Sequence, residues 1–210
     1  MQFIDLILHL DKYIGIVVSN YHNYYYLILF LVIFAETGLV ITPFLPGDSL
    51  LFMSGSIAAL GSLDIKILAV IIVVAACCGD NSNYLIGRFI GTKLFSNPQS
   101  KIFRQSLLIK TTAFYQNKGN QAVIIARFIP IIRTFTPFVA GVATMSYNRF
   151  IFFSIIGSVS WVLVFLCGGY AFGNLPVIRN NLSIIILLIL IITIIPVIKM
   201  VWDEVKPSKK

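Results

Sequence analysis

Charged residues are scarce in this sequence, and their scarcity narrows the class of protein before any motif is considered. Only 11% of the 210 residues are Asp, Glu, Lys or Arg, whereas 58% are hydrophobic and the mean hydropathy is +0.92. A soluble globular domain usually carries about 25% charged residues. The composition therefore excludes an ordinary soluble domain and indicates a single integral membrane domain.

Histidine and cysteine are also rare, which argues against most catalytic and metal chemistry. The two histidines, His9 and His22, both lie within the first 22 residues, and the chain has no DxxD-type cluster of aspartates. Because membrane phosphatases and phosphotransferases commonly need one of these features, we expect no enzyme, no metal and no other cofactor. The three cysteines, Cys77, Cys78 and Cys167, lie in apolar stretches and offer neither a disulfide framework nor a zinc-binding spacing.

The first 20 residues lack the pattern of a secretory signal peptide, because they have no basic n-region and no small-residue cleavage site. Polar residues interrupt their apolar positions at Asp5, His9, Asp11 and Lys12. This pattern predicts that residues 1–20 form an amphipathic helix lying at the membrane interface.

Long apolar runs predict the membrane-spanning helices, since a helix needs roughly 20 apolar residues to cross a bilayer. We expect spans at residues 67–87 and 150–172, and a third, C-terminal span at 181–203. The fold class is therefore an all-α integral membrane protein, with a core over residues 21–180. A basic tail, residues 204–210, follows the last span.

The net charge of +8 is explained by the position of the basic residues along the chain. Six of them occupy the loop 88–118, which has no acidic residue: Arg88, Lys93, Lys101, Arg104, Lys110 and Lys118. By the positive-inside rule this loop and the C-terminus are cytoplasmic, and nucleic-acid binding is not expected. Within the loop, the sequence pattern predicts an interfacial helix over residues 98–117. Asn97 is its expected N-cap, and Gly119 is expected to end it.

Two other apolar segments, residues 24–60 and 121–145, contain helix breakers: Pro43, Pro46 and Gly47 in the first, and Pro130, Pro137 and Gly141 in the second. If 121–145 crossed the membrane, the lysine tail would lie outside, so the charge rule favours a segment that enters and returns. For the first segment two alternatives stay open. Residues 24–42 span the membrane and 48–60 form a half-helix, or the whole segment is one hairpin.

Each half of the chain thus pairs a broken apolar segment with a continuous span. Broken segments at corresponding positions of two halves indicate a transporter's binding site. Non-helical backbone persists at membrane depth only where protein or a water-filled cavity satisfies it. We therefore predict an inverted-repeat, transporter-like fold with two opposed re-entrant helical hairpins.

Four ionisable residues lie within the broken segments: Glu36, Asp48, Arg127 and Arg133. Unpaired, they would cost about 10–14 kcal/mol at the bilayer centre, at roughly 2.5–3.5 kcal/mol each. The two acids balance the two bases, so we predict that the broken segments meet and form an ion-pair network around a polar cavity. The alternatives are that Asp48 only caps a helix, that the arginines snorkel to an interface, or that the pairing is purely structural.

The two arginines suit a phosphate ligand. Arg127 and Arg133 are six residues apart, and Pro130 is expected to bend the chain between them so that both face one cavity. Thr136 and Pro137 predict the start of a new helix, whose free N–H groups would point to the same place. Paired guanidiniums near a helix N-terminus can grip a phosphate through parallel hydrogen bonds.

The carboxylates indicate how transport could be driven. A buried carboxyl group near an arginine can exchange protons as a cavity opens to each side. Glu36 is the first candidate for this role, Asp48 the second and Asp80 the third; Asp80 lies about 12 Å along a helix from Arg88. Sodium coordination would use the same oxygens, so both ions stay open.

Three stretches together resemble the DedA family of bacterial inner-membrane proteins, also described as VTT-domain or SNARE-associated-type proteins. They are "FAETGLVITPFLPGDSLL", "GDNSNYLIGRFIG" and "ARFIPIIRTFTPFVAGVATMSYNRF", within residues 24–173. The resemblance implies that Glu36, Asp48, Arg127 and Arg133 correspond to the family's required charged residues. It also implies recycling of the lipid carrier undecaprenyl phosphate between leaflets, a role in membrane potential and envelope integrity, and kinship with eukaryotic lipid scramblases.

The leading hypothesis is a transporter that moves a lipid-linked phosphate between leaflets, driven by a proton or sodium gradient. The expected partners are membrane lipids, the lipid-phosphate substrate and the coupling ion. The alternative is a proton-coupled exporter or antiporter of small ions or drugs. A trafficking adaptor is not supported, because the chain has no soluble interaction domain or coiled coil. The oligomeric state is left open.

Overall fold

The computed structural model describes residues 22–38, 47–94 and 119–173, together with residues 109, 112, 113, 116 and 175. All the regular elements in these ranges are helices. They are α3 (His22–Gly38), α4 (Gly47–Ala59), α5 (Ile65–Leu94), the 3-10 turn η1 (Gly119–Gln121), α7 (Ala122–Ala126), α8 (Pro130–Val142), α9 (Tyr147–Val162), the π-helical turn η2 (Leu163–Cys167) and α10 (Gly168–Gly173).

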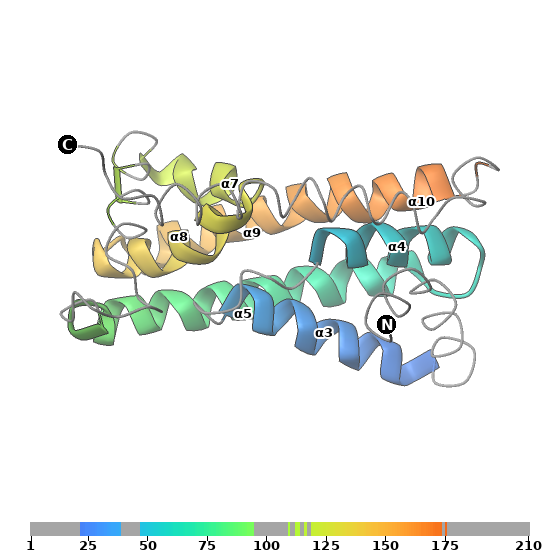
Figure 1. Ribbon diagram of the computed structural model, residues 1–210, viewed down its shortest axis with the longest axis horizontal. Helices are drawn as coiled ribbons and strands as arrows, with labels where there is room; N and C mark the ends of the chain where they lie inside the picture. The colour runs from blue at the N-terminus through green and yellow to red at the C-terminus, as the bar shows by residue number, and fades with distance from the viewer. Residues whose placement is uncertain are drawn as a thin grey trace, which may run out of the picture. The chain divides into compact units, whose positions relative to one another are not determined.

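The helices, which are labelled in Figure 1, belong to two compact units. The first unit contains α4 and α10, which pack closely because small residues line their contact. A Cβ added to Gly55 would stand 2.8 Å from the backbone nitrogen of Tyr170, and one added to Gly173 would stand 2.6 Å from the Cα of Ser56. The Ser56 hydroxyl also donates a 3.1 Å hydrogen bond to the carbonyl of Gly169. Glycine at these positions lets the two backbones touch.

The second unit contains most of α3 together with α5, α7, α8 and α9. The long helix α5 contacts α3 and α8 through two glycines about two turns apart. A Cβ on Gly79 would stand 2.9 Å from the nitrogen of Gly38 in α3, and one on Gly87 would stand 3.0 Å from the Cα of Phe138 in α8. Without a hydrophobic driving force in lipid, such small-residue contacts are a main source of helix association.

The chain breaks between α7 and α8, and the break lies where Pro130 was expected to cause one. Pro130 is the first residue of α8, a position at which its missing N–H removes no intrahelical bond. Arg127 caps the C-terminal end of α7, while Arg133 lies in the first turns of α8. The two arginines are therefore carried by separate helices.

The expectation that a new helix starts at Thr136 and Pro137 is wrong. α8 begins at Pro130 and continues through Pro137 to Val142, so Pro137 is not a break. The Thr136 hydroxyl donates a 2.7 Å hydrogen bond to the carbonyl of Ile132 within the helix. Pro137 has no N–H to donate to the carbonyl of Arg133, four residues earlier. Asn83 of α5 donates to the carbonyl of the next residue, Thr134, at 2.6 Å, so a neighbouring helix supplies a donor to this part of α8.

The turn from α8 to α9 is a Schellman motif. The amide of Met145 donates to the carbonyl of Ala140 at 3.0 Å, and the amide of Thr144 donates to the carbonyl of Gly141 at 3.1 Å. Thr144 occupies the left-handed position with φ of 54°, which usually belongs to glycine. A β-branched side chain there is strained.

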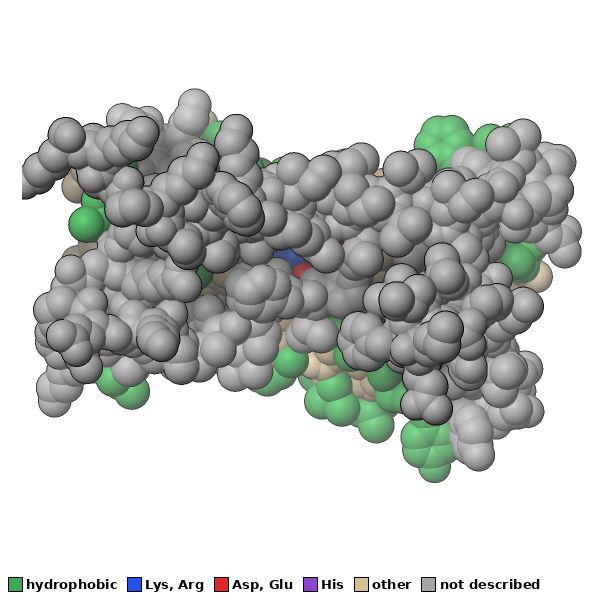
Figure 2. All heavy atoms as spheres, viewed as in Figure 1, with side chains coloured by type: hydrophobic (Ala, Val, Ile, Leu, Met, Phe, Trp, Pro, Cys, Tyr) green, Lys and Arg blue, Asp and Glu red, His purple; other side chains and the backbone are tan. Residues whose placement is uncertain are grey.

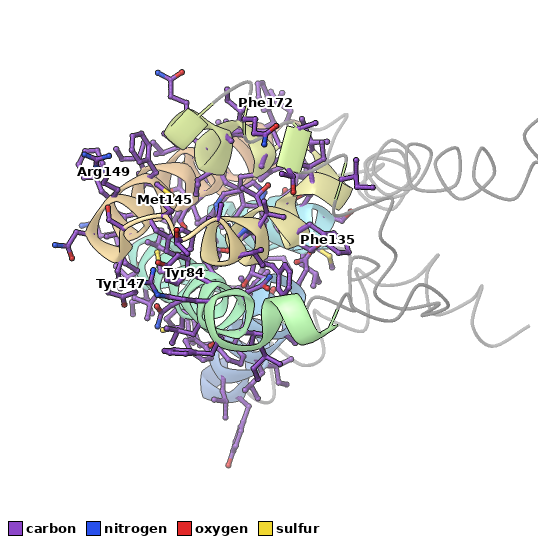
Figure 3. The ribbon with its side chains drawn as sticks, turned by 90° about the vertical axis from the view of Figure 1, so that its left-hand side faces the viewer. Tyr84, Phe135, Met145, Tyr147, Arg149 and Phe172 are labelled. Carbon is purple, nitrogen blue, oxygen red and sulfur yellow. The ribbon has the colours of Figure 1, made fainter. Side chains whose placement is uncertain are left out.

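Side chains of α5 hold this turn in place. The Tyr84 hydroxyl donates to the carbonyl of Met145, and Arg88 donates to the same carbonyl at 3.3 Å and to the Tyr84 oxygen at 2.8 Å. The ring of Tyr84 also stacks on Phe150 of α9, with centroids 4.4 Å apart. Figure 3 labels Tyr84, Met145 and Tyr147, which lie close together.

Several charged and polar side chains are buried in the described part of the protein, while many large hydrophobic side chains are exposed. Large hydrophobic side chains of α3, α5 and α9 are exposed, among them Leu31, Val70 and Phe152, each more than half exposed. Glu36 and Thr134, by contrast, are completely buried. Among the described side chains visible in Figure 2, hydrophobic ones project from the surface and charged atoms appear at a single place. This arrangement suits a lipid environment rather than water.

The two continuous spans predicted from the sequence are confirmed as long apolar helices. The helical segments Ile65–Ile90 and Tyr147–Gly173 are long and apolar enough to cross a membrane. Helix α5 extends several residues beyond the predicted span 67–87. The predicted segments 1–20 and 181–203 lie outside the described residues, as do Pro43, Pro46 and almost all of the interfacial helix 98–117.

Replacing Thr144 by glycine is expected to stabilise the protein. Glycine removes the strain of the left-handed conformation, which stabilises the folded protein by about 1–2 kcal/mol. Its greater freedom in the unfolded chain destabilises the folded protein by about 0.5–1 kcal/mol. The purified protein in detergent should therefore unfold at a slightly higher temperature. The control is Ala143→Gly, where φ is −74° and glycine brings only the entropic loss. A lower unfolding temperature for Thr144→Gly would contradict the strain.

Candidate functional site

Two arginines and two carboxylates are buried together in the second unit. Arg133 of α8 donates through Nη2 to Oε1 of Glu36, which lies in the last turn of α3. Arg127, at the end of α7, donates through Nη2 to Oδ2 of Asp80 in α5. None of the four side chains is more than 5% exposed. The structure thus brings together four of the five ionisable residues selected from the sequence, in two buried ion pairs.

Serine hydroxyls of α9 complete the Arg127–Asp80 pair. Ser154 donates to Oδ2 of Asp80 at 2.6 Å, and Ser158 accepts from Nη2 of Arg127 at 2.6 Å. Ser158 in turn donates to the carbonyl of Ser154 at 2.8 Å and lies 3.4 Å from the sulfur of Cys77. Because both ionic partners also bond to hydroxyls, this pair is held in one geometry.

The guanidinium groups also share an aromatic partner. Trp161 of α9 is completely buried. The Cζ atom of Arg133 lies 5.2 Å from the centroid of its ring, and that of Arg127 lies 5.8 Å from it. Both distances are within the range of a cation–π interaction.

A small cavity lies beside the arginines, lined by Asp80, Val123, Arg127, Arg133 and Pro137. Its volume open to water centres is about 10 Å³, which is room for about one water molecule. Nη1 of Arg127 is buried and has no hydrogen-bond acceptor among the described residues. The site therefore offers a cationic donor next to a polar cavity, which is chemistry suited to an anion.

Asn83 joins the helices that carry the charges. It lies on α5 one turn after Asp80 and donates to the carbonyl of Thr37 in α3 at 3.2 Å and to that of Thr134 in α8 at 2.6 Å. Thr37 and Thr134 are the residues next to Glu36 and Arg133 in the chain. Asn83 therefore fixes the spacing between the backbones from which the Glu36–Arg133 pair extends.

The second acid of the site differs from the one ranked higher in the sequence. Glu36 and Asp80 balance Arg127 and Arg133, so these four groups sum to zero charge. Asp48 belongs to the first unit, where it is buried in the first turn of α4 and follows Gly47. It lies inside the helix rather than at the cap position considered above, and its coupling role stays a prediction.

Sequence reasoning missed the contribution of α9, which it treated as a plain span. Ser154, Gly157, Ser158 and Trp161 follow one another at i, i+3, i+4 and i+7, so they share one face of the helix. A polar and small-residue stripe of this kind in an otherwise apolar span was the available signal. Asn83 was equally visible, one turn after Asp80.

Comparison with known proteins supports a membrane protein. The family model described as the VTT domain matches residues 45–171. The chain is 50% identical to Protein DedA of Escherichia coli strain K12, over 92% of this chain and 89% of that protein. It is 42% identical to an uncharacterized membrane protein of Mycobacterium leprae, over 85% of this chain and 80% of that protein. It is 34% identical to the inner membrane protein YqjA of Escherichia coli strain K12, over 72% of this chain and 69% of that protein. No solved structure matches the chain.

Breaking the Arg127–Asp80 pair should destabilise the protein more than removing both partners. Asp80→Asn or Arg127→Met alone leaves a buried charge without its counter-ion, which typically costs about 3–5 kcal/mol. The double variant should lose clearly less than the sum of the two single losses, as measured by thermal unfolding in detergent. Ser82→Ala is the control on the same helix, because among the described residues that hydroxyl bonds only to the carbonyl of Cys78. Additive losses would show that the two groups do not interact.

Proposed function

Because this chain belongs to the DedA family of VTT-domain membrane proteins, we propose that it is a transporter, and not an enzyme, that moves a lipid-linked phosphate between membrane leaflets. The substrate is undecaprenyl phosphate or a phospholipid. The observation that carries this proposal is the convergence of Arg127 and Arg133 on one small cavity. Two buried guanidiniums are costly in a membrane protein and are characteristic of substrate or ion pathways.

The arginines would hold the phosphate headgroup while the hydrocarbon tail stays in lipid. A guanidinium can donate two parallel hydrogen bonds to a phosphate, and Nη1 of Arg127 makes none to the described residues. The exposed hydrophobic side chains of α3, α5 and α9 would face the isoprenoid or acyl chain. This division of labour fits the burial of the four charged groups of the site among the described residues of the second unit.

Headgroup entry requires the ion pairs to open. The cavity has room for about one water molecule, whereas a phosphate group brings four oxygens. The phosphate would therefore replace a carboxylate as the partner of each arginine. An exchange of one anion for another keeps the guanidiniums paired throughout, which avoids leaving a buried charge alone.

Proton or sodium coupling follows from the charge balance of the site. The four charged groups sum to zero, so an added phosphate leaves buried negative charge unless a cation accompanies it. A proton on Glu36 or Asp80, or a sodium ion bound by their oxygens, would restore neutrality. Asp48, in the other unit, is the remaining candidate for coupling. Translocation of the lipid phosphate between the leaflets would therefore depend on the cation gradient.

The lengths of α7 and α8 support a re-entrant path for residues 121–145. α7 has 5 residues and α8 has 13. At about 1.5 Å per residue neither helix reaches across a hydrocarbon core of roughly 30 Å. We propose that this segment enters the membrane and returns to the cytoplasmic side, that residues 24–60 form the opposed broken segment, and that the loop 88–118 and the C-terminus are cytoplasmic.

Proteoliposomes that contain a fluorescent polyprenyl phosphate test the proposal directly. Arg133→Ala should lower the flipping rate by at least about 10-fold, because a hydrogen bond to a charged group contributes roughly 1.5–3 kcal/mol. Arg88→Ala is the matched control, since that arginine contacts the Tyr84–Met145 turn instead of the cavity. If flipping persists in Arg133→Ala while cation or drug flux disappears, the protein is an exporter or antiporter instead.

Leaflet-resolved labelling in cells tests the coupling role of Glu36. Glu36→Gln keeps the size of the side chain but removes its charge, so it cannot exchange a proton. Undecaprenyl phosphate should accumulate in the outer leaflet of cells that carry only this variant. The matched variant Asp64→Asn changes a carboxylate in the loop before α5, outside the site. Equal leaflet distributions in Glu36→Gln and wild-type cells would remove Glu36 from the mechanism.

A further inference from the structure

We propose that Trp161 is a positioning residue that holds Arg127 and Arg133 together whenever their carboxylate partners are displaced or neutralised. The inference rests on the proposed function and, of the substrates named there, it concerns a phosphate monoester. The indole ring is completely buried on α9. Both guanidinium carbons lie within 5.8 Å of its centroid.

The carboxylate partners of the arginines change state during the proposed cycle. Glu36 and Asp80 are either exchanged for phosphate or neutralised by a cation. The indole ring does not titrate at physiological pH and carries no net charge, so its attraction for a cation is the same in every step. A cation–π contact is also strongest with tryptophan and in a desolvated site. Trp161 is therefore the constant partner of the two guanidiniums.

Three residues on one face of α9 lie against Arg127. The side chain of Arg127 lies across the helix at Gly157, where an added Cβ would stand 3.4 Å from Nε and 3.6 Å from Cδ. One residue later Ser158 accepts from Nη2 of the same arginine. Trp161 follows one turn further along the same face. Gly157 therefore lies beside the Cδ and Nε atoms of Arg127, Ser158 accepts a hydrogen bond from its guanidinium group, and Trp161 makes the cation–π contact with it.

A shared ring also affects which anion the site prefers. Two guanidiniums repel each other unless negative charge or an electron-rich face lies near both. By keeping both close to one ring, Trp161 presents them to a single ligand. A phosphate monoester, with a charge near −1.5 to −2 at neutral pH, fits two fixed cations better than a phosphodiester with a charge of −1.

Fluorinated tryptophan separates this electrostatic role from packing. The chain has two tryptophans, and Trp202→Phe leaves Trp161 as the only site of incorporation. Successive fluorine substitution weakens the negative face of the ring and barely alters its shape. The full-length protein in detergent should bind farnesyl monophosphate less tightly with each added fluorine. Trp161→Phe should bind several-fold more weakly, and Trp161→Leu roughly 10- to 30-fold more weakly.

The matched control for lost aromatic volume is Phe150→Leu, on the same helix. Phe150 is also completely buried, and its ring stacks on Tyr84. This variant should lose thermal stability but keep its affinity for farnesyl monophosphate. A flat affinity across the fluorinated series, in a protein that does bind the probe, would overturn the proposed role of Trp161.

A second measurement needs no substrate, so it distinguishes failure of this inference from failure of the proposed function. In the Trp202→Phe background, the emission of Trp161 should shift in Arg127→Ala and in Arg133→Ala, because a cation is removed from the ring. Arg88→Ala should leave the emission unchanged. Unchanged emission in both cavity variants overturns the inference. A wild-type protein that flips no lipid phosphate overturns the proposed function, whatever the emission shows.

Discussion

A charge buried among apolar side chains must have a partner, and this requirement organises the second unit. Glu36, Asp80, Arg127 and Arg133 come from four different helices, yet each of the four makes an ion pair. Separating any pair would leave a charge in a medium of low dielectric constant, where it is costly. The pairs therefore act as long-range constraints that specify how α3, α5, α7 and α8 come together.

Short side chains on α5 allow these constraints to be met. Gly79 and Gly87 bring the backbones of α3 and α8 close to α5, and Asn83 between them bonds to both neighbours. Lipid provides no hydrophobic force that would press helices together, so close packing and interhelical hydrogen bonds must do so. The same contacts set the distance over which the carboxylates and guanidiniums reach each other.

A site whose charges are already paired is also suited to exchange. If the arginines met the phosphate from an unpaired state, the resting protein would carry two buried cations. Pairing with Glu36 and Asp80 stabilises the resting protein, and the proposed transport step substitutes one anion for another. The serine hydroxyls and the ring of Trp161 keep their orientation during such an exchange, because neither depends on ionisation.

Much of the fold and part of the site follow from the sequence. The two continuous spans are determined by runs of apolar residues, and the break before Pro130 is determined by the missing N–H of that residue. The need to pair intramembrane charges is equally local information, since Glu36, Arg127 and Arg133 are each surrounded by apolar neighbours.

Only the tertiary structure decided which residues meet. Pro137 looked like a second break, but α8 continues through it beside the side-chain donor Asn83 of another helix. Asp80 ranked below Asp48 in the sequence, yet it is the partner of Arg127. The stripe that ends at Trp161 lies in an apolar span, and its role depends on which helix packs against it. Pairings between helices depend on crossing points, and the sequence of one helix holds no information on where another crosses it.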